Sequence, residues 1–153
     1  MRSIDRWLED YGDSHRNAVN KRIHWVCVPV IVWCVLALLW SVPTGSLRHT
    51  IANWGVLAAA AAVAYYAFLS ARLAAGAGVL LIGMLYSIAV VERAGPWSLW
   101  HVSIVLFVLA WLGQFIGHHI EGKRPSFLRD IQFLMIGPLW LLADLYRRLG
   151  IGW

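Results

Sequence analysis

Four long apolar runs dominate the sequence and restrict its possible folds more than any other feature. They cover residues 23–40, 53–70, 73–91 and 97–120. Because an α-helix rises about 1.5 Å per residue, each run is about long enough to cross the hydrocarbon core of a bilayer. Hydrophobic residues make up 60% of the 153 residues and charged residues only 14%, unlike a soluble domain. The sequence therefore predicts an all-α membrane protein in which four transmembrane helices form a single domain over residues 1–153.

Shorter segments flank the four runs at both ends of the chain. Residues 1–14 carry apolar side chains at helical spacing between acidic ones, which predicts an N-terminal amphipathic helix on the membrane interface. Its apolar positions are Ile4, Trp7, Leu8 and Tyr11. The tail, residues 126–149, has an apolar segment that is too short to span and is interrupted by Gly137 and Pro138. We expect the tail to form C-terminal interfacial or re-entrant half-helices.

Basic residues are distributed unevenly between the two predicted faces of the membrane. Four spans place both termini on one face, and all of the 13 Lys and Arg residues fall on that side except Arg48 and Arg93. By the positive-inside rule, both termini are predicted to be cytoplasmic. The net charge of +5 then reflects membrane topology, and no nucleic-acid partner is expected.

Two polar stripes stand where the first apolar run begins and the last one ends. Residues spaced i, i+3 or i+4, and i+7 share one face of a helix. The stripes consist of Asn17, Asn20 and His24 at the first run, and of Gln114, His118 and Glu121 at the last. Gly113 and Gly117 would let the first helix approach the last one closely. Because an even number of spans puts both stripes at the same face, they must be satisfied by each other, by water or by a metal.

His15 cannot share the face of His24 if a single helix runs through both. Nine residues turn a helical side chain by about 180°. Either the chain bends between residues 14 and 17 and brings His15 over the site, or His15 is not a ligand. An N-cap at Asn17 or Asn20 would provide such a bend.

The other histidines are weaker candidates for a shared site. His119 is rotated by about 100° from its neighbour on the helix and is kept as a secondary candidate. His101 and His49 fall at the opposite face of the membrane, and His101 lies roughly 25 Å from His118 along the helix. Neither can join the same set of ligands.

The residue types at the two stripes suit a non-haem metal. Neutral imidazoles with a carboxylate and open coordination positions match the ligand sets of iron(II) oxygenases, whereas closed zinc sites more often recruit cysteines. Alternatives are a hydrolase or desaturase-like enzyme with another metal, a bis-histidine haem-binding electron carrier using His24 and His118, and a scaffold without metal. Arg22, Lys123 and Arg124 either anchor the helices or bind an acidic substrate group.

The two histidine segments also resemble a known family, the fungal-type 2-hydroxy fatty acid dioxygenases, which are small multi-pass membrane proteins with bacterial homologues. The motifs that carry the resemblance are His15-Arg16-Asn17-x-x-Asn20-x-x-Ile23-His24-x-x-Cys27-Val28-Pro29 and Gln114-Phe115-Ile116-Gly117-His118-x-x-Glu121-Gly122-x-x-Pro125. The resemblance covers nearly the whole chain, including the tail around Gly137.

This resemblance implies an iron(II)-dependent enzyme that uses dioxygen to shorten a 2-hydroxy fatty acid by one carbon, which leaves as carbon dioxide. Its metal residues would be His15, His24, His118 and Glu121. We expect Asn17, Asn20 and Gln114 to orient these ligands, and Arg22, Lys123 or Arg124 to bind the substrate carboxylate. The resemblance favours a bacterial inner membrane over the endoplasmic reticulum. The sequence is also compatible with a homo-oligomer.

Overall fold

The computed structural model describes residues 3–45, 50–128 and 130–153, and within these ranges it consists of helices joined by short connections. The helices are α1 (Ile4–Gly12), α2 (Ala18–Ser41), α3 (Trp54–Leu69), α4 (Ala71–Ala94), α5 (Leu99–Glu121), the short 3-10 helix η2 (Ser126–Leu128) and α6 (Phe133–Arg148). Three of them, α2, α4 and α5, are long and apolar enough to cross a membrane, and α3 is a shorter apolar helix. The chain is therefore an all-α membrane protein, as predicted. His49, Arg48, Arg2 and Arg129 lie outside the described residues.

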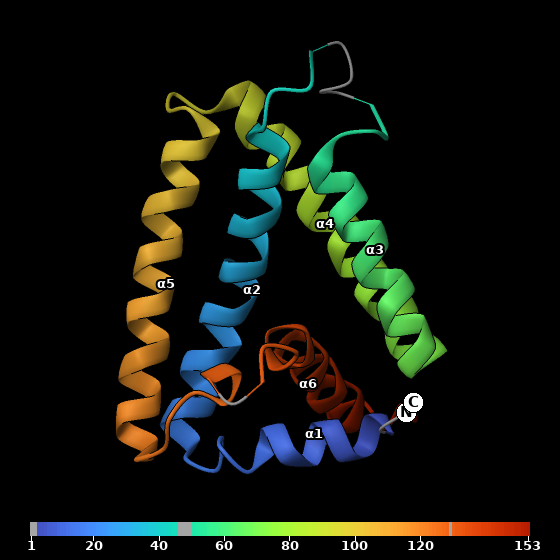
Figure 1. Ribbon diagram of the computed structural model, residues 1–153, viewed down its shortest axis with the longest axis vertical. Helices are drawn as coiled ribbons and strands as arrows, with labels where there is room; N and C mark the ends of the chain where they lie inside the picture. The colour runs from blue at the N-terminus through green and yellow to red at the C-terminus, as the bar shows by residue number, and fades with distance from the viewer. Residues whose placement is uncertain (1–2, 46–49, 129) are drawn as a thin grey trace.

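The long helices form two groups that meet at one end of the molecule (Figure 1). α2 and α5 run side by side, and α3 and α4 form a second pair joined at Ser70, whose extended backbone caps both. Glycines allow the close contact of α2 with α5: a Cβ atom on Gly113 would lie 2.7 Å from Cys27 Sγ, and one on Gly117 would collide with Asn20 Oδ1. This is the contact that the spacing of the two glycines predicts.

The N-terminal helix α1 crosses the lower end of the molecule in Figure 1. Its predicted apolar face is present, but it packs on α6 rather than standing free: Trp7 and Phe133 meet edge to face, with ring centroids 5.3 Å apart. The Tyr11 and Trp140 rings also pack together, tilted at 51° with centroids 5.5 Å apart. α1 therefore covers α6, and the connection that follows α1 lies at the start of α2.

The tail differs from the prediction of two half-helices. α6 runs through Gly137 and Pro138 without a break. Proline removes one backbone hydrogen bond, but tight packing on both sides holds the helix, since Ile136 and Leu139 have no exposed surface. The Tyr66 hydroxyl of α3 also donates to the Met135 carbonyl over 2.9 Å. Tertiary contacts thus override the local tendency of Gly-Pro to end a helix.

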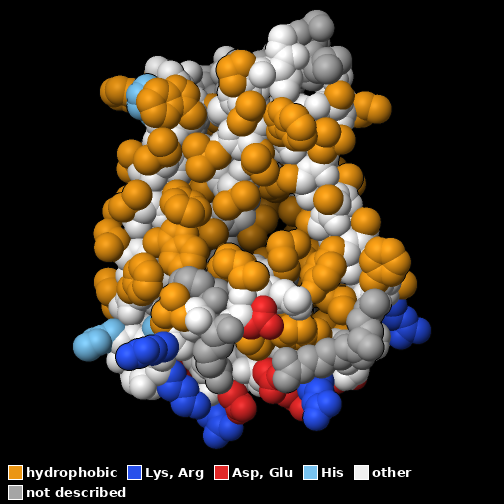
Figure 2. All heavy atoms as spheres, viewed as in Figure 1, with side chains coloured by type: hydrophobic (Ala, Val, Ile, Leu, Met, Phe, Trp, Pro, Cys, Tyr) orange, Lys and Arg blue, Asp and Glu red, His pale blue; other side chains and the backbone are white. Residues whose placement is uncertain are grey.

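On the face shown in Figure 2, the charged side chains lie at the end of the molecule where α1 lies, and hydrophobic side chains cover the rest. Glu92 and Arg93 lie at the opposite end, in the last turn of α4. Large apolar side chains on α5 point outward, with Leu109 58% and Ile116 57% exposed. Such a surface suits a lipid environment, in which apolar side chains need no cover from protein. The polar end would then stand at one membrane face.

Candidate metal centre

Three histidines meet at the polar end of the molecule, between α1, α2 and α5. His15, His24 and His118 each offer a ring nitrogen, and these three atoms lie within 4.8 Å of one another. All three side chains are buried, with 1%, 1% and 6% of their surface exposed. Their rings pack edge to face, with centroids 4.2 to 5.0 Å apart.

The chain bends between α1 and α2, and this bend brings His15 to the other two histidines. Asn17 ends the bend as the N-cap of α2, because its side-chain oxygen accepts from the backbone N–H groups of Val19 and Asn20. The His15 ring stacks on Tyr11 with centroids 4.2 Å apart. Of the two alternatives for His15, the structure therefore shows the bent one.

Backbone hydrogen bonds set the orientation of two imidazoles. His15 Nδ1 lies 2.7 Å from the Tyr11 carbonyl, and His24 Nδ1 lies 3.0 Å from the Asn20 carbonyl. A carbonyl oxygen can only accept, so both Nδ1 atoms carry the proton and both Nε2 atoms present a lone pair. Burial, followed by the neighbouring His24, lowers the pKa of His15 to about 3, so that this ring is neutral at physiological pH. Neutral imidazole is the form that binds metals.

The positions of the ring nitrogens are more favourable with a bound metal ion than without one. His15 Nε2 and His24 Nε2 are 2.9 Å apart, so two lone pairs face each other without a proton between them. Nitrogens bound to one metal at about 2.1 Å and at right angles would be about 3 Å apart. His118 adds a buried Nδ1 that has no hydrogen-bond partner in the described part of the chain. The three residues can therefore hold a metal ion through neutral nitrogen donors.

Glu121 lies beside the three histidines but outside this group. One of its oxygens accepts from the backbone N–H of Arg16 over 2.9 Å. The other accepts from the backbone N–H of Asn17 over 2.9 Å and from the Asn20 amide over 3.1 Å. The carboxylate is thus directed at the start of α2 and ties the end of α5 to it, rather than facing the ring nitrogens as the sequence-based prediction has it.

The remaining predicted residues divide into buried and exposed ones. Asn20 is fully buried and also donates to the Ser14 carbonyl over 3.4 Å. Gln114 is 6% exposed. The exposed residues are His119, Arg22, Lys123, Arg124 and His101. Lys123 donates to the Asp13 carbonyl over 2.6 Å. The basic residues therefore stand on the outer surface and are not buried with the three rings.

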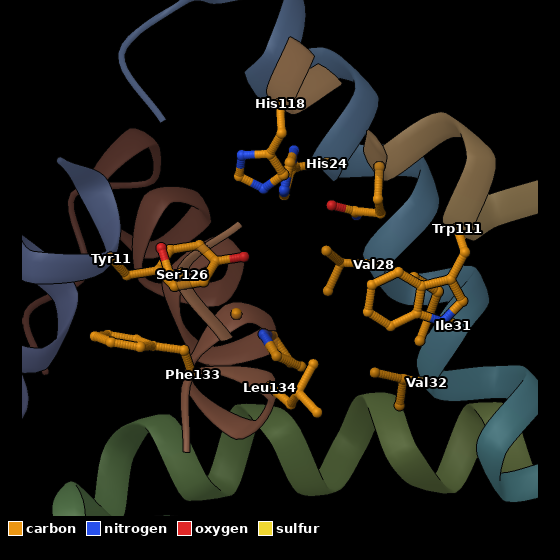
Figure 3. Close-up of a pocket in the computed structure, with 13 residues that line it drawn as sticks. Tyr11, His24, Val28, Ile31, Val32, Trp111, His118, Ser126, Phe133 and Leu134 are labelled. Carbon is orange, nitrogen blue, oxygen red and sulfur yellow. The ribbon is translucent and has the colours of Figure 1, made fainter. Parts of the chain in front are cut away.

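A cavity extends from the histidines toward the middle of the membrane-spanning region. Figure 3 shows His24 and His118 at one end, Tyr11, Ser126 and Phe133 on one side, and Val28, Ile31 and Trp111 on the other. The remaining lining residues are Val32, Gln114, Leu134, Gly137 and Pro138. The walls are mainly apolar, and most polar groups lie near the histidine end.

Most residues that line the cavity have no feature in the sequence that marks them as functional. Tyr11 belonged to the amphipathic pattern of the first helix and Trp111 to an apolar run, so neither differed from a packing residue. Ser126 directly follows the Pro125 that closes the second motif, which is the one signal that could have drawn attention to it. A cavity lined by five separate elements, α1, α2, α5, η2 and α6, has no signature in sequence spacing.

Comparisons with known proteins found similarity over most of the chain. A family model described as "2-hydroxy-palmitic acid dioxygenase Mpo1-like" matches residues 1–149. The chain is also similar to the 2-hydroxy-palmitic acid dioxygenase MPO1 of Saccharomyces cerevisiae, with 27% identity over 142 residues that cover 92% of this chain and 78% of the yeast protein. No solved structure matches the chain.

Proposed function

The chain belongs to the Mpo1-like family of 2-hydroxy-palmitic acid dioxygenases, and on this premise we propose that it is an iron(II)-dependent dioxygenase acting on 2-hydroxy fatty acids. The reaction would convert R–CH(OH)–COOH and O2 into R–COOH, CO2 and H2O. The bond between C1 and C2 breaks, C2 becomes the new carboxyl carbon, and O2 accepts all four electrons. Atoms and electrons therefore balance without an added reductant.

We propose His15, His24 and His118 as the iron ligands. The observation that carries this assignment is the convergence of two fixed Nε2 lone pairs at 2.9 Å beside a buried, partnerless His118 nitrogen. Iron bound there would supply the one-electron chemistry by which dioxygen reacts with a closed-shell acid. Three protein ligands leave coordination positions open for other groups. Glu121 and Asn20 would hold α2 and α5 in register, and Asn17 would hold the bend that carries His15.

The geometry argues against the haem alternative. The rings of His24 and His118 have centroids 5.0 Å apart and stand at 89° to each other. Axial ligands from two helices must be separated by the flat macrocycle, and these rings are in contact instead. A hydrolase that uses another metal at the same histidines stays a rival, and product analysis distinguishes it from a dioxygenase.

The proposed reaction would take place at one face of the membrane. The positive-inside pattern supports cytoplasmic termini, and we propose a bacterial inner membrane as the location. Exposed Arg22, Lys123 and Arg124 beside the site would attract anionic amphiphiles from the membrane surface. The acyl chain would stay in the apolar region while the carboxylate approaches the histidines.

Product analysis of the purified protein tests this function. The full chain is purified without oxygen, supplied with Fe2+ and then given 2-hydroxypalmitic acid and 18O2. The proposal expects a 15-carbon acid that carries 18O, together with carbon dioxide, and no product from His118→Ala. His101→Ala, an exposed histidine on the same helix, is the control and should retain activity. A fully active His118→Ala variant would rule out the proposed site.

A further inference from the structure

The cavity beside the three histidines contains hydrogen-bond donors that the protein itself does not use. Gln114 Nε2 and Ser126 Oγ are both buried and have no hydrogen-bond partner among the residues that the structure describes. Their side chains are 6% and 1% exposed, and both residues line the cavity. Burying a donor without a partner is unfavourable, so an unpaired donor inside this cavity indicates that a ligand pairs with it.

These donors come from two different segments and lie at the same cavity as the metal-binding rings. Gln114 lies one turn before His118 on α5, whereas Ser126 begins η2 after the chain has turned at Gly122, where φ is 71°. In Figure 3, Ser126 lies across the cavity from Trp111 and Val28. The two donors therefore approach the space next to His24 and His118 from separate elements.

We propose that this cavity binds the substrate, with Gln114 and Ser126 donating hydrogen bonds to its carboxylate and 2-hydroxyl oxygens. The acyl chain then lies against the apolar lining residues Val28, Val32, Trp111 and Leu134. This inference rests on the proposed function, because the 2-hydroxy acid is the substrate that it assigns to the chain. It adds the two residues that recognise the head group and the path that the chain takes.

The positive charge of the metal explains why two neutral donors are enough to bind the substrate head group. Three neutral imidazoles do not neutralise the charge of a divalent metal. The metal itself would therefore compensate the negative charge of a substrate carboxylate that reaches it. A cationic side chain in the cavity would compete with the metal for the same low-dielectric space. Arg22, Lys123 and Arg124 are exposed, and none of them lines the cavity. Neutral donors are therefore the appropriate partners for the remaining oxygen lone pairs.

The shape of the lining selects a single-chain amphiphile. His24 and His118 lie at one end of the cavity and Ser126 on one side of it, and α2, α5 and α6 provide most of the apolar lining. Tyr11 adds an aromatic wall on the side where Ser126 lies. An acid without the 2-hydroxyl would leave one donor unpaired and would bind more weakly.

Substitutions of the two donors test the head-group assignment. Gln114→Leu and Ser126→Ala, each as the full-length iron-loaded protein, should keep the wild-type iron content but lower kcat/KM for 2-hydroxypalmitic acid about tenfold or more, mainly through KM. Matched controls are Gln132→Leu and Ser98→Ala, which change exposed residues outside the cavity. Unchanged KM in both donor variants at full iron content would overturn the inference and leave the proposed function standing.

Photocrosslinking tests the path of the chain without depending on turnover. Iron-loaded wild-type protein in lipid nanodiscs, kept without oxygen so that no turnover occurs, is labelled with a 2-hydroxy fatty acid that carries a diazirine near the middle of its chain. The inference expects labelling at residues 28–32, Trp111 and Leu134, and competition by 2-hydroxypalmitic acid several-fold stronger than by palmitic acid. Labelling confined to the outward-facing Phe115 and Ile116 would overturn it even if the protein is an active dioxygenase.

Discussion

At the scale of single residues, the three histidines differ in how far sequence could identify them. Helical spacing and an even number of spans were enough to pair His24 with His118. The position of His15 depends on a bend whose direction only tertiary contacts decide, here the stacking on Tyr11. Glu121 was predicted to be a ligand because it shares a helix face with His118. A shared helix face does not determine which group the carboxylate contacts. In the structure the carboxylate accepts hydrogen bonds from N–H groups at the start of α2.

Glu121→Gln separates the two roles of this residue. As a positioning group, Glu121 accepts three hydrogen bonds, and an amide nitrogen in place of one oxygen would face an N–H donor. We expect the free energy of unfolding to fall by about 1–2 kcal/mol while one iron per chain is retained. Metal analysis and urea denaturation in detergent measure both quantities, with the exposed Glu9→Gln as control. Loss of all iron at unchanged stability would make Glu121 a ligand instead.

At the scale of helices, apolar runs and caps predicted α2 to α5 because hydrophobic length is a local property of the sequence. The tail could not be predicted in the same way. Whether Gly137 and Pro138 end a helix depends on whether neighbouring helices hold both halves, and here the Tyr66 hydroxyl and the packing of Ile136 do so. The contact of α2 with α5 was predictable from Gly113 and Gly117.

Gly117→Ala should weaken the metal site through helix packing alone. The added methyl group would collide with Asn20 Oδ1, so α2 and α5 must separate slightly and carry His24 away from His118. We expect a loss of roughly 1–3 kcal/mol in stability and weaker iron binding, measured by thermal unfolding and anaerobic titration. Gly83→Ala on α4 is the matched control, because no atom lies near its added Cβ. Equal behaviour of the two variants would contradict this packing role.

At the scale of the whole molecule, the proposed topology depends on whether the short helix α3 crosses the membrane. Its 16 residues rise about 24 Å, less than a hydrocarbon core of about 30 Å. In Figure 1, α3 nevertheless runs back from the end where α2 finishes, beside α4. The arrangement therefore resembles four crossings, with both termini at the same end.

Cysteine labelling from each side of the membrane tests this topology. We expect Lys21→Cys and Arg147→Cys to react with an impermeant maleimide only in inside-out vesicles, and Ser98→Cys only in right-side-out cells. All three positions are exposed, whereas Cys34 is buried and Cys27 half-buried. Reaction of Lys21→Cys and Arg147→Cys from opposite sides would show an odd number of crossings and would contradict the shared face.

We propose that three neutral histidines together hold the iron, one from the bend between α1 and α2 and one each from α2 and α5. The most direct measurement is the iron content of anaerobically reconstituted protein, determined for the wild type and for single alanine variants at each histidine. We expect one iron per chain in the wild type, His119→Ala and His101→Ala, and at least a tenfold weaker affinity in His15→Ala, His24→Ala and His118→Ala. Full iron binding by His24→Ala, or loss of iron in His119→Ala, would contradict the account.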